Sequence, residues 1–209
     1  MKFPKRGLYA ITQTAGKTIA DVLADVEAAL KGGAKVIQYR DKSPLDVQAL
    51  GSQLLQVCHR YQVPLLINDD PELALALGAD GVHLGRDDQE LQYARRLLGP
   101  QAIIGVSCYN DIQRAREMQA NSADYIAFGR FFPSTSKPLA APAQLETLRL
   151  AKQVLTIPVV AIGGILPENG GQLLASGADL LAVIGGVFDN GNPEAAAQAY
   201  QALFNISEE

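Results

Sequence analysis

The feature that most constrains the fold of this chain is a repeated alternation of short apolar runs and longer helical segments, recurring roughly every 25 residues. The segment after the first run shows apolar residues at Ile19, Val22, Val26 and Leu30, the spacing of a buried helical stripe. Further helices are expected near residues 43–61, 111–120, 144–154 and 193–204. The expected strands are residues 7–12, 35–42, 65–67, 82–84, 103–108, 125–130, 158–164 and 180–187.

These runs are too continuously apolar to leave one face of a sheet in water, which is typical of parallel strands covered by helices. Eight strand–helix units can close into a barrel. A doubly wound sheet usually has fewer strands and a nucleotide-binding fingerprint, and the sequence has neither G-x-G-x-x-G after the first run nor a Walker A motif. The prediction is therefore an α/β fold, a (β/α)8 TIM barrel, as one domain over residues 1–209.

Composition excludes several classes of partner. A net charge of −4 without a basic run argues against nucleic-acid binding. No segment approaches the ~20 apolar residues of a membrane span, and the N-terminal sequence lacks the apolar core of a signal peptide. Cys58 and Cys108 show no metal-binding spacing. We therefore expect a cytoplasmic protein that binds neither membranes nor nucleic acids.

Acidic clusters follow the third and fourth apolar runs, at residues 68–70 and 85–88. The ends of neighbouring parallel strands meet at one edge of the sheet, where barrel enzymes keep their chemistry. Asp69 and Asp88 are therefore candidates to share one Mg²⁺, which prefers oxygen ligands. Acids in this position can also simply cap the next helix, and we prefer that role for Asp70 and Asp87.

Cations gather at the same edge. Gln38, Arg40 and Lys42 lie two residues apart, so they share one face of their strand, and Lys137 follows the sixth strand. A single Arg or Lys after a strand is usually a solvated surface charge. Several of them beside a possible Mg²⁺ site instead indicate a diphosphate bound by metal and cations together.

Glycine pairs end the seventh and eighth apolar runs, at residues 163–164 and 185–186. In barrels of this type, backbone N–H groups from the last two loops commonly bind a phosphate. Glycines also simply permit tight turns, and either reading fits the pairs alone. Ser134 and Ser136 could add hydroxyls to the same phosphate. Two anion sites imply two phosphorylated small-molecule substrates.

These residues resemble the thiamine phosphate synthase family over essentially the whole chain, in the family's order and spacing. The matching segments are LYAIT, QYRDK, LLINDDPELALALGADGVHLG, IIGVS, ADYIAFGRFFPSTSK, IPVVAIGGI and GADLLAVIGG. The resemblance implies a transferase that joins 4-amino-2-methyl-5-hydroxymethylpyrimidine diphosphate to plain or carboxylated thiazole phosphate. The implied products are thiamine phosphate and pyrophosphate, with CO₂ from the carboxylated thiazole.

The resemblance also assigns residues by position. It implies pyrimidine diphosphate binding by Gln38, Tyr39, Arg40, Asp41, Lys42, Asn68, Ser107 and Lys137. It implies thiazole phosphate binding by Ser134, Thr135 and Ser136 and by the backbone of Gly164, Ile184 and Gly185. Asp69 and Asp88 would bind the Mg²⁺ cofactor, and Arg40, Lys42, Ser107 and Lys137 would act in catalysis.

The chemistry fits this assignment, because diphosphate can leave from an electron-rich aminopyrimidine through a dissociative, cationic path. Such a site needs charge stabilisation and positioning more than a base. No nucleophile–base pair is evident from the sequence. His59 is expected in a helix, and His83 is expected to pack in the barrel as a structural residue.

The sequence departs from the family at three places. Arg86-Asp87-Asp88 stands where Gln-Glu-Asp is common, Ser134 to Lys137 replaces T-x-T-K, and Arg130 replaces a frequent proline. None removes a group that the chemistry requires. The loop from Phe131 to Pro142 is expected to be mobile without ligand. The sequence leaves open a homo-oligomer and the choice between the two thiazole phosphates.

Three other functions compete with the synthase. A related thiazole tautomerase would not need Lys42, Asp69 and Asp88, and that group resembles the synthase but has a His where this chain has Tyr109. A non-catalytic thiazole phosphate or thiamine phosphate binder would be indifferent to Mg²⁺. An unrelated barrel isomerase would need a general acid and base across the mouth.

Overall fold

The computed structural model describes residues 1–41, 46–85, 88–133, 142–189 and 191–205, and for residues 88–90 the backbone only. The strands are β1 (Gly7–Ile11), β2 (Val36–Tyr39), β3 (Leu65–Asn68), β4 (Gly81–Leu84), β5 (Ile103–Tyr109), β6 (Tyr125–Gly129), β7 (Val159–Ile162) and β8 (Leu180–Val183). The helices are α1 (Ile19–Lys31), α2 (Val47–Arg60), α3 (Pro71–Leu77), α4 (Asp88–Leu98), α5 (Ile112–Ala120), α6 (Leu145–Val154), α7 (Pro167–Ala175), α8 (Gly185–Phe188) and α9 (Pro193–Asn205).

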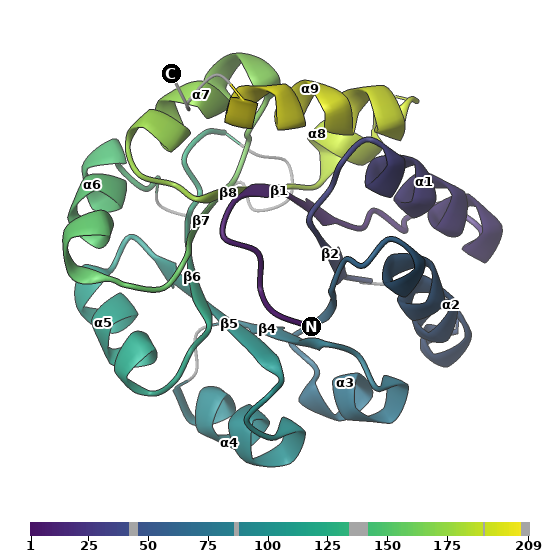
Figure 1. Ribbon diagram of the computed structural model, residues 1–209, viewed down its shortest axis with the longest axis horizontal. Coiled ribbons are helices and arrows are strands. Elements are labelled where there is room, and N and C mark those ends of the chain that lie inside the picture. Colours follow the sequence, from purple (N-terminus) through teal and green to yellow (C-terminus); the bar gives the residue numbers. More distant parts are fainter. Residues whose placement is uncertain (42–45, 86–87, 134–141, 190, 206–209) are drawn as a thin grey trace.

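The strands close a barrel in chain order, from β1 to β8, with every neighbouring pair parallel. Pairing of β1 with β8, from Gly7 opposite Leu180 to Ala10 opposite Val183, completes the ring. Figure 1 shows the helices surrounding this ring. The prediction of a (β/α)8 TIM barrel is confirmed. No helix in the described ranges is long and apolar enough to cross a membrane.

Strand alternation divides the buried side chains into two layers. Leu8, Ala10 and Ile37 belong to the larger layer between strands and helices. Tyr9 and Tyr125 belong to the smaller layer inside the barrel. The inner layer carries large aromatic and aliphatic side chains, so the barrel interior beneath the carboxyl ends of the strands is filled rather than open.

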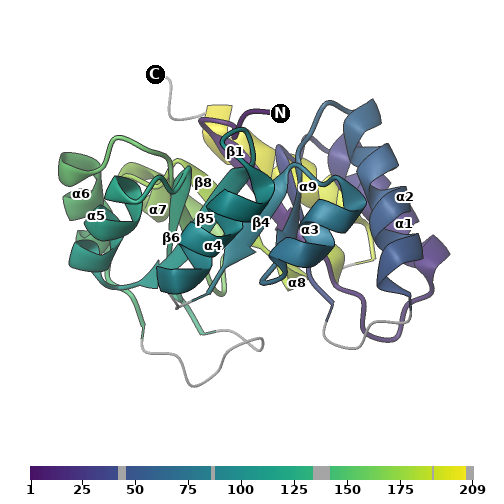
Figure 2. The same cartoon turned by 90° about the horizontal axis from the view of Figure 1, so that it is seen from below.

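The N-terminal segment closes the end of the barrel opposite the carboxyl ends of the strands. In Figure 1 this purple segment crosses the centre of the ring, and Figure 2 places the N-terminus on the upper side of the molecule. The Phe3 ring stacks on Tyr125, with ring centroids 4.0 Å apart and planes 6° apart. Phe3 therefore covers the inner aromatic layer at this end of the barrel.

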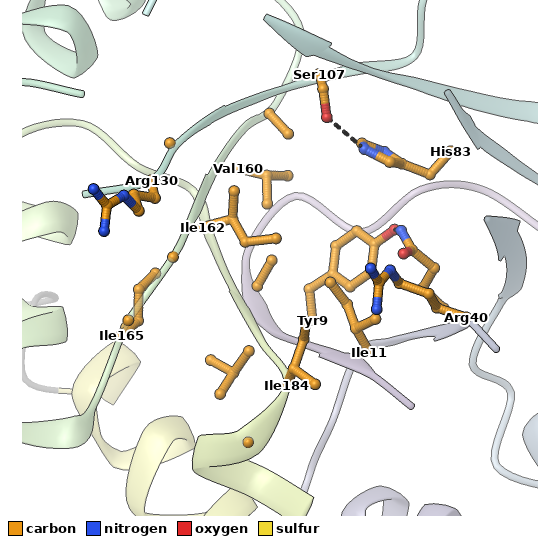
Figure 3. A pocket seen from close by; sticks show the side chains of 18 of the residues that line it. Tyr9, Ile11, Arg40, His83, Ser107, Arg130, Val160, Ile162, Ile165 and Ile184 are labelled. Carbon is orange, nitrogen blue, oxygen red and sulfur yellow. Dashed lines mark hydrogen bonds between the residues drawn. The ribbon is translucent and has the colours of Figure 1, made fainter. Parts of the chain in front are cut away.

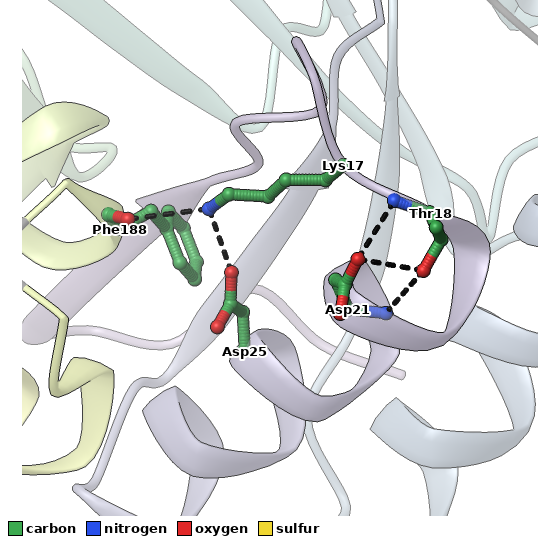
Figure 4. A network of polar contacts seen from close by, with 5 residues as sticks. All are labelled: Lys17, Thr18, Asp21, Asp25 and Phe188. Atoms are coloured by element: carbon green, nitrogen blue, oxygen red, sulfur yellow. Dashed lines mark hydrogen bonds and ion pairs between the residues drawn. The ribbon is translucent and has the colours of Figure 1, made fainter.

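Side chains fix the end of the β1–α1 connection where α1 begins (Figure 4). Thr18 and Asp21 form a capping box at the start of α1, in which each side chain accepts the other residue's backbone N–H. Lys17 Nζ donates to Asp25 Oδ2 at 2.7 Å and to the Phe188 carbonyl at 3.2 Å. Lys17 thus ties α1 to the last residue of α8.

The largest difference from the predicted elements is at the end of β8. A strand over residues 180–187 was expected, but it is wrong beyond Val183. Ile184, at φ −105° and ψ −90°, turns the chain out of the strand, and its carbonyl accepts the N–H groups of Val187 and Phe188. Two consecutive glycines at 185–186 favour this turn over continued strand pairing. The result is the short helix α8.

Candidate active site

A cavity of about 400 Å³ opens at the carboxyl ends of the strands. Residues from every strand or from the loop that follows it line the cavity (Figure 3). Eight residues that the sequence analysis selected lie in its wall: Gln38, Arg40, Asn68, Asp69, Ser107, Gly164, Ile184 and Gly185. The structure therefore brings together most of the described candidates, from five of the eight strands and the loops that follow them.

Two candidates do not line the cavity. Tyr39 is buried on the opposite side of β2, among residues that pack against the helices. Asp41 accepts a hydrogen bond from Thr14 Oγ1 at 2.9 Å and one from the Tyr39 hydroxyl at 3.4 Å. Burial, and secondarily the Asp41 charge, raises the pKa of Tyr39 to about 12. Strand alternation explains this placement, since Gln38 and Arg40 point inward and Tyr39 points outward.

Other candidates lie outside the described residues. They are Lys42, Ser134, Thr135, Ser136 and Lys137, together with Arg86 and Asp87 of the β4–α4 connection and most of the 131–142 loop. Asp88 is the first residue of α4, and only its backbone is described. Among the described residues, no group of three or more potential metal-ligating side chains occurs.

Arg40 lies just beyond the end of β2. The side chain of Thr12, the residue that follows β1, fixes the Arg40 backbone. Thr12 Oγ1 accepts the Arg40 N–H at 2.9 Å and donates to the Arg40 carbonyl at 3.0 Å. The guanidinium makes no hydrogen bond or ion pair within the described part of the chain. Arg40 is therefore a positioned cation available to a ligand anion.

Asn68 and Asp69 form a second polar corner. The Asp69 N–H donates to the His83 carbonyl at 2.8 Å, and Asn68 Nδ2 donates to Asp69 Oδ2 at 2.8 Å. Asp69 has φ +57°, a left-handed conformation that is sparsely populated for non-glycine residues. Asp70 instead caps α3 through a bond from the Leu73 N–H at 2.8 Å, as predicted.

The glycine loops form the opposite side of the cavity. Gly163 and Gly164 have φ values of +104° and +64°, which favour glycine. A Cβ on Gly164 would lie 2.3 Å from the Pro133 carbonyl oxygen, and one on Gly163 would lie 2.3 Å from Arg130 Cβ. These close approaches explain why the loop after β7 needs both glycines. Arg130 itself lines the cavity.

One tyrosine of α9 joins the two glycine loops from outside. The Tyr200 hydroxyl donates to the Ile165 carbonyl at 2.9 Å. A Cβ on Gly186 would lie 2.1 Å from the same hydroxyl oxygen. Burial raises the pKa of Tyr200 to about 12, so its hydroxyl stays protonated and able to donate. Tyr200 therefore sets the spacing between the loop after β7 and α8.

Sequence reasoning missed the polar floor of the cavity. Gln38 Nε2 donates to the Tyr9 hydroxyl at 2.7 Å, and the Tyr9 and Tyr125 hydroxyls are 2.8 Å apart. His83 Nδ1 lies 2.8 Å from the Tyr125 hydroxyl, and His83 Nε2 lies 2.9 Å from Ser107 Oγ. Figure 3 shows the bond between His83 and Ser107. Desolvation raises the pKa of Tyr9 and of Tyr125, so both phenols stay protonated.

The polar floor bears on two predictions from the sequence: that His83 is structural, and that no nucleophile–base pair is present. His83 packs in the barrel as predicted, but it also lines the cavity and bonds Ser107. The structure therefore holds a serine–histidine pair that the sequence analysis did not find. The available signal was parity, since His83 stands between Val82 and Leu84, whose side chains face the helices.

Together these features define a class: a (β/α)8-barrel enzyme whose cavity has a cation and a carboxylate on one side and glycine loops on the other. The profile of the thiamine monophosphate synthase family matches residues 8–187. The chain belongs to the thiamine monophosphate synthase family and is a transferase of thiamine biosynthesis.

Individual relatives agree with this membership. The thiamine-phosphate synthase of Nitrosococcus oceani is 50% identical over 201 residues, covering 95% of this chain and 93% of that protein. The thiamine-phosphate synthase of Methylococcus capsulatus is 46% identical over 207 residues, covering 98% and 92%. The structure of thiamine phosphate pyrophosphorylase from Pyrococcus furiosus superposes with a TM-score of 0.87, at 33% identity and 98% coverage of both chains.

Proposed function

We propose that this protein joins the pyrimidine diphosphate to a thiazole phosphate, releasing pyrophosphate and thiamine phosphate. The observation that carries the proposal is the arrangement of one cavity with a polar, charged corner and a glycine-loop corner. In the view of Figure 3, Arg40 and Ile165 lie on opposite sides of this cavity. Such a cavity suits two phosphorylated substrates bound at the same time, with their reacting atoms between the anion sites.

The charged corner would hold the diphosphate. Arg40 offers a fork of N–H donors that matches phosphate oxygens. Asp69 lines the cavity, and its Oδ1 has no hydrogen-bond partner in the described part of the chain, so this carboxylate oxygen is available to coordinate a hard cation. Asp69 would hold Mg²⁺, with Asp88 at the start of α4 as the second candidate. When bound, Mg²⁺ would neutralise charge on the departing diphosphate.

The glycine corner would hold the thiazole phosphate. Gly164 and Gly185 line this side of the cavity, and their backbone N–H groups would donate to the phosphate. Phosphate binding by the last two loops and a short extra helix is the usual arrangement in barrels of this type. The hydroxyls of Ser134, Thr135 and Ser136 would add to this site by family resemblance.

The proposed reaction follows a dissociative path. The bond from the pyrimidine methylene carbon to the bridging diphosphate oxygen breaks, and its electron pair leaves with the diphosphate. The thiazole nitrogen then donates its lone pair to the same carbon. Arg40, with Lys42 and Lys137 by resemblance, would stabilise the leaving charge. The apolar side chains of Ile11, Val160 and Ile162 line the cavity and would keep water from the pyrimidine cation that forms when the diphosphate leaves.

A product assay with each substrate alone and with both together tests this proposal. Thiamine phosphate and pyrophosphate should form in equal amounts only when both substrates are present. Turnover of the thiazole phosphate alone would instead indicate an isomerase. Binding of thiazole phosphate without any turnover, unchanged by Mg²⁺, would indicate a binding protein.

A further inference from the structure

The serine–histidine pair at the cavity floor has two possible chemical roles, and they depend on the position of one proton. If His83 Nε2 lacks a proton, it accepts the Ser107 hydroxyl proton and could activate that oxygen. If Nε2 carries the proton, it donates to Ser107 Oγ. The Ser107 proton is then directed at the ligand. The distance of 2.9 Å fits both roles, so the rest of the hydrogen-bond network decides.

The network begins at Gln38, which is 2% exposed and donates through Nε2 to the Tyr9 hydroxyl. The Tyr9 oxygen therefore accepts at this end. Within the described residues the Tyr9 hydroxyl has one other partner, the Tyr125 hydroxyl. Tyr9 is 1% exposed, so a proton pointed elsewhere would be buried without an acceptor, which is costly. The Tyr9 proton therefore goes to Tyr125.

The Tyr125 hydroxyl is the next member of the chain. Tyr125 is fully buried, and its described partners are the Tyr9 hydroxyl and His83 Nδ1. Since Tyr125 accepts from Tyr9, its own proton must go to Nδ1. Phe3 stacks on one face of the Tyr125 ring, which holds the ring and its hydroxyl oxygen in place between Tyr9 and His83. A neutral His83 that accepts at Nδ1 carries its proton on Nε2.

We propose that Gln38, Tyr9, Tyr125, His83 and Ser107 form a one-way hydrogen-bond chain that fixes the His83 proton on Nε2 and makes Ser107 a donor to the ligand. Tyr9, Tyr125 and His83 are positioning residues in this chain. Ser107 is then not a nucleophile activated by His83. The same direction leaves Gln38 Oε1, which has no partner in the described part of the chain, as an acceptor toward the cavity.

The two ends of the chain thus offer one acceptor and one donor to the same cavity. A heteroaromatic edge that carries an amino N–H beside a ring nitrogen has the complementary pattern. This reading rests on the proposed function, since the aminopyrimidine substrate has such an edge. A ligand edge with the reversed pattern would require the Gln38 amide to turn over, which would reverse every bond of the chain down to Ser107.

The position of the His83 proton can be measured directly, without substrates, by ¹⁵N NMR of the histidine rings. The protein has only two histidines, and the second is an internal reference. This reference is His59, which belongs to α2, away from the barrel interior. Its Nε2 lies 2.9 Å from Asp80 Oδ2. At about pH 8, we expect His83 to show an unprotonated Nδ1 and a protonated Nε2 in the wild type.

Substitution Gln38→Glu tests transmission along the chain. An ionised carboxylate accepts from Tyr9, so Tyr9 would accept from Tyr125, and Tyr125 from His83. We expect the Nδ1 shift of His83 to move to the protonated range, while His59 is unchanged. Adding Tyr125→Phe to Gln38→Glu interrupts the chain and should abolish that movement. The Phe ring keeps the contact with Phe3, and circular dichroism would verify folding of each variant.

Two results would overturn the proposal: a wild-type His83 with its proton on Nδ1, or the same proton position in wild type and Gln38→Glu. Neither result depends on turnover. A failed product assay would remove the proposed substrates but not the hydrogen-bond chain, and a failed NMR test would remove the chain but not the reaction.

Discussion

Thr12 bonds Arg40 twice through a single hydroxyl, accepting from its N–H at 2.9 Å and donating to its carbonyl at 3.0 Å. β2 ends at Tyr39, so no strand pairing fixes Arg40. Thr12 extends the pairing of β1 and β2 by one residue, since its own N–H donates to the Gln38 carbonyl at 3.0 Å. The cation at the cavity mouth is therefore positioned by a buried threonine.

Substitution Thr12→Val should weaken substrate binding through Arg40. Valine has nearly the same shape but leaves two backbone groups of Arg40 without partners, at a cost of about 1–3 kcal/mol. We expect the KM for the pyrimidine diphosphate to rise about tenfold, with a smaller change in the KM for thiazole phosphate. Thr12→Ser keeps the hydroxyl, so both KM values should stay at the wild-type level. Thr14→Val is a control, because the Thr14 hydroxyl bonds Asp41, outside the cavity wall. Equal effects of Thr12→Val and Thr14→Val would contradict this role.

Substitution Gly186→Ala should disturb the proposed thiazole phosphate site. The new Cβ would lie 2.1 Å from the Tyr200 hydroxyl oxygen and 2.9 Å from Val183 Cγ1, so α8 or α9 must move. We expect a loss of about 1–3 kcal/mol in the free energy of unfolding and a higher KM for thiazole phosphate. Gly171→Ala in α7 is the matched control. Its Cβ would meet nothing within 4 Å, so it should be neutral or stabilising.

Features set by local sequence patterns were predictable, whereas features made by contacts between distant residues were not. Apolar periodicity was sufficient to predict the barrel, because each strand and helix carries its own local pattern. Alternation within one strand also placed Gln38 and Arg40 on the cavity side. The polar floor was not predictable in this way. It joins Tyr9 to Tyr125 and His83 to Tyr125, residues 116 and 42 positions apart, and only closure of the barrel brings them together.

The α8 helix was mispredicted for a local reason. The sequence analysis correctly found the glycines at 185–186 but continued the strand through them to Val187. The run stays apolar because Val187 and Phe188 are buried as part of α8. Hydrophobicity alone does not distinguish a buried strand from a short buried helix.

Substitution Lys17→Met should lower stability through the contact between α1 and α8. Lys17 Nζ is partly buried between Asp25 and the Phe188 carbonyl, and Met keeps most of the apolar stem. We expect a loss of about 1 kcal/mol in the free energy of unfolding, measured by urea denaturation. Lys31→Met, on the exposed last turn of α1, should change stability by less. Equal losses in the two variants would show that the Lys17 contacts do not stabilise the fold.

Stability should decline in alkaline solution because of the buried tyrosines. The pKa of Tyr9 and of Tyr125 is raised by burial in the folded state, whereas an unfolded tyrosine ionises near its ordinary pKa of about 10. Full stability is therefore present below about pH 10 and is lost as the pH rises toward the folded-state pKa, by about 1.4 kcal/mol per pH unit for each group. Urea unfolding between about pH 9 and pH 11 measures this slope. Tyr9→Phe should reduce it, and an unchanged slope would contradict the assignment to Tyr9.

The most direct test of the account compares two neighbouring aspartates in a Mg²⁺-dependent product assay. Asp69→Asn removes the carboxylate that faces the cavity, while Asp70→Asn removes a charge one residue away but keeps a good cap for α3. We predict that wild type and Asp70→Asn release thiamine phosphate and pyrophosphate together, that chelation of Mg²⁺ stops both products, and that Asp69→Asn loses at least about 100-fold in kcat/KM. Full activity of Asp69→Asn, or turnover that is unaffected by chelation, would contradict the proposed site and reaction.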